Sequence, residues 1–133
     1  MKYIIVGAAL SGFLLMGDGS ATAGRRSDFT TLMTLQPDGS GRATGALGAS
    51  RNSANELEYI GCEVEASAAG TTAGCVATDA AHNFRVCFTT DPALIEVLKT
   101  MTSDAYVDFT WDAAGRCSRI LIATYSFNGP GLP

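Results

Sequence analysis

The sequence has few of the residues that build catalytic sites and nucleic-acid interfaces. Its 133 residues include a single histidine, His82, and Lys99 is the only lysine apart from Lys2. The formal net charge is −4, and the basic residues are scattered along the chain rather than gathered into a stripe. Nucleic-acid binding usually requires a clustered basic surface. The composition therefore predicts that nucleic acid is not a partner.

Motifs for metal and nucleophile chemistry are also lacking. The chain contains no G-x-S-x-G, no H-E-x-x-H and no phosphate-binding loop. No two cysteines have the close spacing of a zinc site. Asp38 lies in a glycine-rich turn, but a calcium loop needs several carboxylates at alternate positions. We therefore expect neither a metal nor a cofactor.

The chain also lacks an apolar run of the roughly 20 residues that a membrane-spanning helix needs. Its first segment instead has a basic residue at Lys2, an apolar stretch over 3–16 and small residues over 21–23. This three-part pattern predicts a secretory signal peptide over residues 1–23, cleaved after Ala23.

The expected mature chain begins at Gly24. We predict a single β domain over residues 24–127, followed by a flexible tail over 128–133, where glycine and proline disfavour a strand. The protein is expected to be secreted, either to the periplasm or to the extracellular medium, without a membrane span after cleavage.

All four cysteines follow the leader, and an even number in an oxidising compartment predicts two disulfides. Folding "CVATDAAHNFRVC" about its middle places Cys75 opposite Cys87, with His82 in the turn. We favour that pair, which leaves Cys62 to join Cys117. The competing set joins Cys62 to Cys75 and Cys87 to Cys117, because residues 62 and 75 also flank a turn. The spacing leaves both sets open.

Segments rich in glycine, proline, aspartate and asparagine separate runs of β-branched and aromatic residues along the mature chain. This spacing is typical of a small antiparallel β-sandwich or barrel. We predict a mainly β, disulfide-stabilised domain of about seven strands, near residues 28–35, 41–48, 57–65, 74–79, 84–89, 105–111 and 116–125.

One segment has a helical pattern instead. Asp91 and Pro92 are typical of an N-cap and a first helical position, and apolar residues follow at helical spacing. They predict one short helix over about 92–101 that covers the sheet.

The segment 105–125 predicts a hairpin. Pairing Trp111 with Arg116 places Phe109 opposite Ser118 and Asp108 opposite Arg119, which would form a cross-strand ion pair. The expected apolar face consists of Val107, Phe109, Trp111, Ile120 and Ile122.

The polar loop over residues 50–59 is the predicted binding surface, because loops on rigid scaffolds often carry recognition. We expect its side chains to contact an unidentified protein or surface ligand; the alternative is a hydrogen-bonded loop that only closes the sheet. The candidate binding residues are Arg51, Asn52, Ser53, Asn55 and Tyr59.

These features favour a non-enzymatic binding or structural module of the cell envelope or extracellular space, for example an inhibitor of a secreted hydrolase. The alternative is a small secreted hydrolase that uses Glu63, Glu65 or His82. Glu63 and Glu65 are two residues apart and should share one strand face, where they could equally keep an edge strand soluble. A pocket that brings two or more of these groups together would favour the hydrolase.

Overall fold

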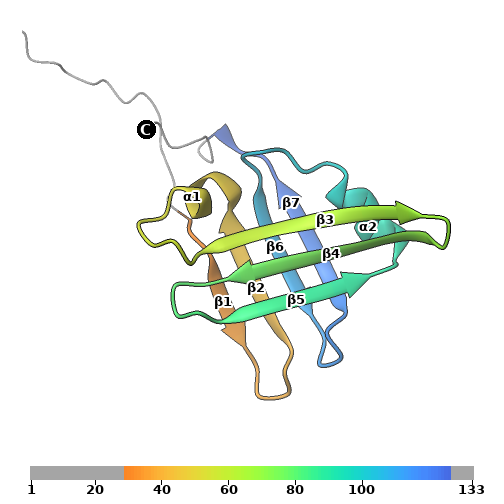
Figure 1. Ribbon diagram of the computed structural model, residues 1–133, viewed down its shortest axis with the longest axis horizontal. Coiled ribbons are helices and arrows are strands. Elements are labelled where there is room, and N and C mark those ends of the chain that lie inside the picture. The colour runs from red at the N-terminus through yellow and green to blue at the C-terminus, as the bar shows by residue number, and fades with distance from the viewer. Residues whose placement is uncertain (1–28, 127–133) are drawn as a thin grey trace, which may run out of the picture.

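Seven antiparallel strands form two packed sheets in the computed structural model, which describes residues 29–126 (Figure 1). The four-stranded sheet has the order β1 (Leu32–Leu35), β2 (Gly41–Ala46), β6 (Tyr106–Trp111) and β7 (Cys117–Ala123). The three-stranded sheet has the order β3 (Tyr59–Ser67), β4 (Gly70–Thr78) and β5 (Phe84–Thr89). In Figure 1 its strands lie across those of the other sheet. The predicted fold class is confirmed, while the leader and the tail lie outside the described residues.

Three of the hairpin turns share one geometry. In each five-residue turn the first residue donates its backbone N–H to the last carbonyl, and the fourth residue has a positive φ. This combination of a type I turn and a left-handed residue is a common hairpin connection. The left-handed residues are Gly39 between β1 and β2, His82 between β4 and β5, and Gly115 between β6 and β7.

The core lies between the two sheets and is centred on β6. Phe109 and Val107 are fully buried, and Trp111 packs beside Phe109 with ring centroids 5.7 Å apart. Ala43 of β2 lies beside Phe109 in the same sheet, and Ala73 and Ala77 of β4 join the core from the other sheet. The predicted apolar face is therefore confirmed, with Ile120 buried and Ile122 partly buried.

The predicted register of the β6–β7 hairpin is wrong. Phe109 lies opposite Ile120 rather than Ser118, and Asp108 lies opposite Leu121. The turn and an irregularity between Thr110 and Trp111 together shift the pairing by two residues. Since side chains alternate with a period of two, the shift of two residues leaves Val107, Phe109, Ile120 and Ile122 on the predicted apolar face. At the irregularity the shift is one residue, so Cys117 turns into the core and Ser118 turns outward to Thr110, opposite to their predicted faces.

Two short helices complete the fold. Helix α2 (Pro92–Leu98) confirms the predicted helix, and its N-cap Asp91 accepts the backbone N–H of Ala93 at 2.8 Å. Helix α1 (Leu47–Arg51) was not expected, because it has five residues and no side-chain cap. It is held by tertiary contacts instead, including a hydrogen bond of 2.9 Å between the hydroxyls of Ser50 and Thr31, both buried.

The favoured disulfide pairing is wrong. Cys62 is bonded to Cys75 within the three-stranded sheet, and Cys87 is bonded to Cys117 across the two sheets. This is the competing set, and all four cysteines are used. Two disulfides indicate an oxidising environment.

The geometry of β4 explains the outcome. Cys75 lies opposite both Cys62 and Cys87, so the predicted hairpin register is correct. The Cα atoms of Cys62 and Cys75 are 4.0 Å apart, which is the narrow spacing of a non-hydrogen-bonded pair. A residue of a central strand that forms a narrow pair with one neighbouring strand forms a wide, hydrogen-bonded pair with the other. Cys75 therefore forms its wide pair with Cys87. Phe88 donates its N–H away from β4, to Gly115, which agrees with this assignment.

Replacing Phe109 with alanine tests the core. Because its ring is fully buried, Phe109→Ala should lower the free energy of unfolding by about 3–5 kcal/mol in chemical denaturation. The matched control is Phe84→Ala, which truncates a ring that is half exposed and should cost under about 1 kcal/mol. Equal losses in the two variants would contradict this placement of the core.

Candidate functional site

The outer face of the three-stranded sheet carries exposed apolar side chains. Tyr59, Phe84, Val86 and Phe88 are 46%, 50%, 36% and 59% exposed. Three of them alternate along β5, while Cys87 between them points into the core. The cross-strand pairs Tyr59–Thr78 and Thr78–Phe84 bring Tyr59 onto the same face. We call the surface of these four residues the aromatic face.

Two glycines leave the middle of this sheet face without side chains. Phe88 lies opposite Gly74, where a Cβ atom would come within 3.1 Å of the Phe88 ring. The missing side chain therefore lets the ring lie against β4. Gly61, Val76 and Val86 line the same groove, which has a volume of about 400 Å³.

Glu63 and Glu65 lie on β3 beside this groove. They share the outer face, as predicted, opposite Gly74 and Thr72. Both side chains are exposed, and Glu63 lines the groove itself. The acidic pair thus forms a rim of the aromatic face.

The free edge of β5 is partly occupied. The backbone N–H of Phe88 donates to the carbonyl of Gly115 at 3.3 Å, and Arg116 forms a single parallel bridge with Phe88. Further along the strand, Arg85 donates from Nη1 to the carbonyl of Phe84 at 2.7 Å. An open apolar edge invites pairing with another chain, and these contacts hinder it. The face of the strand is therefore better placed than its edge to meet a partner.

The predicted binding loop uses its polar groups internally. Asn52 donates to the carbonyl of Gly48 at 2.9 Å, and Ser53 donates to the carbonyl of Asn55 at 2.7 Å. The carbonyl oxygen of the Asn55 side chain accepts the backbone N–H groups of residues 57 and 58. These internal hydrogen bonds match the alternative prediction for this segment, a hydrogen-bonded loop that closes the sheet.

The two ends of the loop behave differently. Arg51 belongs to α1 and reaches the carbonyl of Ser103 at 3.1 Å, with its side chain on the surface. Tyr59 begins β3 and is the one predicted binding residue that joins the aromatic face. Sequence reasoning missed Phe84, Val86 and Phe88, although their period-two spacing around a buried cysteine is visible in "FRVCF".

Comparison of the chain with protein-family models, with curated proteins and with solved structures found no match.

His82 occupies the predicted turn and is exposed. The neighbouring Asp79 accepts the backbone N–H groups of Ala81 and Asn83 and the side-chain amide of Asn83. Cys75 is bonded to Cys62, so it offers no thiolate for the imidazole to activate. The residues around His82 thus build a turn rather than a nucleophilic site.

Asp108 and Arg119 do meet, although not as direct cross-strand partners. Arg42 binds both carboxylate oxygens of Asp108, at 2.9 and 2.6 Å, and Arg119 binds one of them at 3.1 Å. Burial alone would raise the pKa of Asp108, but the hydrogen bonds and charges of the two arginines hold it below its usual value. The carboxylate is therefore a structural anion on the outer face of the four-stranded sheet.

His82→Gly should stabilise the protein. A residue with a Cβ atom is strained at a φ of 63°, whereas glycine adopts this conformation freely, as Gly115 does in the equivalent turn. We expect a gain of about 0.5–1 kcal/mol in the free energy of unfolding. Gly115→Ala, the reverse change, should lower it, and a loss of stability in His82→Gly would contradict the turn assignment.

Asp108→Asn should change how stability depends on pH. Because the folded pKa lies below the unfolded value of about 3.9, the carboxylate stabilises the fold above that pH. This contribution disappears as the pH falls through the folded pKa. We expect the variant to lose about 1–3 kcal/mol at pH 7 and to approach the wild type as the pH falls through the folded pKa of Asp108.

The measurement is urea unfolding at a series of pH values. Asp104→Asn is the control, because among residues 29–126 its carboxylate accepts one hydrogen bond, from the exposed Ser103 hydroxyl. This control should follow the wild-type curve, and a constant gap between Asp108→Asn and wild type at every pH would contradict the role of the arginines.

Proposed function

We propose that the protein is an exported, non-enzymatic binding module of the cell envelope or extracellular space, and that it holds a partner protein against the aromatic face. The observation that carries this proposal is the exposure of Tyr59, Phe84 and Phe88, each near half, on one face of one sheet. Exposed apolar patches rimmed by polar residues mark interaction sites. Aromatic side chains at the centre of an interface often dominate its binding energy.

The rim of the aromatic face suggests the chemistry of the partner. Glu63 and Glu65 add two negative charges beside the apolar residues, and the whole chain is acidic. Complementary charges speed encounter and select among partners. The partner expected here presents apolar side chains flanked by lysine or arginine, and a secreted hydrolase with such a surface is one example.

Export is supported by two independent features. The first 23 residues have the pattern of a signal peptide, and the two disulfides suit an oxidising compartment. No helix among residues 29–126 is long and apolar enough to cross a membrane.

The hydrolase alternative has less support. Catalysis needs an acid, a base or a nucleophile around one reacting atom. Glu63 lies in the groove, His82 lies in the turn after β4, and Asp108 is held by two arginines on the other sheet. The described residues therefore do not gather these groups in one place.

A pull-down with the mature chain tests the proposed surface. The bait is incubated with culture medium and envelope fractions of the producing cells, and bound proteins are identified by mass spectrometry. The double variant Phe84→Ser, Phe88→Ser should recover at least about tenfold less partner, since each aromatic anchor is typically worth more than 1 kcal/mol. Both residues are exposed, so the variant should remain folded by circular dichroism.

Two control variants sharpen this test. Leu32→Ser removes a side chain that is 65% exposed on the other sheet and should recover the partner like wild type. Arg51→Ala, Asn52→Ala changes the predicted loop and should also recover it fully. Undiminished recovery by the aromatic-face variant, or no partner with wild type, would contradict the proposal.

A further inference from the structure

A second concave surface opens at one end of the sandwich, where the chain between β5 and α2 faces the β6–β7 turn. This end cleft has a volume of about 950 Å³, within the usual range of small-molecule sites. Its lining includes Phe88, Thr90, Pro92, Leu94, Asp112 and Arg116. Phe88 belongs to both surfaces, so the cleft adjoins the aromatic face.

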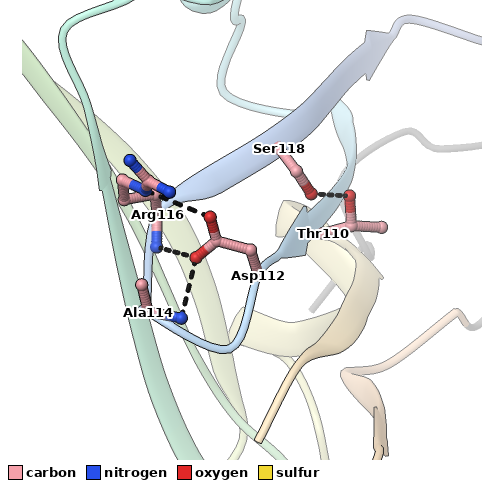
Figure 2. Close-up of polar contacts among 5 residues, drawn as sticks. All are labelled: Thr110, Asp112, Ala114, Arg116 and Ser118. Carbon is pink, nitrogen blue, oxygen red and sulfur yellow. Dashed lines mark hydrogen bonds and ion pairs between the residues drawn. The ribbon is translucent and has the colours of Figure 1, made fainter. Parts of the chain in front are cut away.

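Arg116 is positioned by the turn itself (Figure 2). One oxygen of Asp112 accepts the backbone N–H groups of Ala114 and Arg116, each at 2.9 Å, and the other accepts Nε of Arg116 at 3.1 Å. The ion pair uses Nε, so the two terminal nitrogens remain as donors beside the cleft. The Arg116 side chain is 77% exposed.

Asp112 stays ionised over the physiological range. The backbone N–H of Arg116 lowers the pKa of its carboxyl most, burial opposes this as the second-largest effect, and the guanidinium lowers the pKa further, so that the pKa lies below its usual value. The pair therefore offers guanidinium donors and carboxylate acceptors side by side.

The cleft also has apolar lining residues beside this ion pair. Phe88 is 59% exposed, and Pro92 and Leu94 continue the apolar wall. An aromatic ring next to an ion pair suits a ligand that has both an apolar face and many polar groups.

The charged side chains that line the cleft disfavour a strongly ionic ligand of either sign. The lining holds two carboxylates, of Asp91 and Asp112, and one guanidinium, of Arg116, so it disfavours an anion. A cation bound to these carboxylates would displace the N-cap bond of Asp91 or the guanidinium from Asp112, whereas a neutral hydroxyl can donate to the remaining lone pair of Asp112 and leave both in place. The hydroxyls of Thr72 and Thr90 add neutral donors and acceptors.

We propose that the end cleft binds a neutral saccharide, whose C–H face lies on Phe88 while its hydroxyl groups pair with Arg116 and Asp112. This site goes beyond the proposed protein contact, since it uses the β6–β7 turn, which is not part of the aromatic face.

An NMR titration of the isotope-labelled mature protein tests this site. The probes are maltotriose, cellotriose and chitotriose, each added up to about 20 mM, which covers the weak range of saccharide affinity. At least one should shift the Nε–H signal of Arg116 and the amide signals of Phe88 and Thr90. Arg116→Ala should weaken that binding at least fivefold, whereas Arg119→Ala, on the outer face of the four-stranded sheet, should not change it.

Three results would overturn the saccharide site. They are the absence of shifts with all three probes, unchanged binding by Arg116→Ala, and tighter binding of the anionic trigalacturonate than of any neutral probe. Arg116→Ala should still recover the partner protein in the pull-down, so failure of the cleft and failure of the aromatic face give different results.

Discussion

The disulfide between Cys87 and Cys117 joins an edge strand of one sheet to an edge strand of the other. Neighbouring residues on a strand point to opposite faces, so directing Cys87 into the core directs Val86 and Phe88 to solvent. The same bond holds the β6–β7 turn against β5, where Gly115 accepts the N–H of Phe88. The aromatic face, the occupied edge and the end cleft all depend on this cross-link.

The cross-links also explain how a small protein can leave large apolar side chains exposed. A domain of this size buries a limited core, and here alanines and half-cystines make up much of it. In the loop-entropy model, a disulfide that closes a loop of the length found here stabilises the folded state by about 3 kcal/mol. That stabilisation offsets the apolar burial forgone at Phe84 and Phe88, which remain available for a partner.

Local sequence signals were sufficient to predict helix α2 and the hairpin turns. Asp91 and Pro92 marked the start of α2, and turn residues marked the hairpins, because capping and turn chemistry act over a few residues. Helix α1 could not be predicted, since Ser50 and Thr31 are distant in sequence and meet only in the folded core. The hairpin shift arose from the turn and from an irregularity at Trp111, and alternation of side chains reveals neither of them.

The candidate site was predicted only in part. Tyr59 was selected with a loop whose polar groups turned out to satisfy one another, as at Asn55. The sequence by itself determined the strands, the apolar face of β6 and the need for two disulfides, because these follow from local periodicity and composition. Only the tertiary structure decided which cysteines pair and where Phe88 and Arg116 meet, because a strand spacing of 4.0 Å and the contact between the two sheets exist only once the chain is folded.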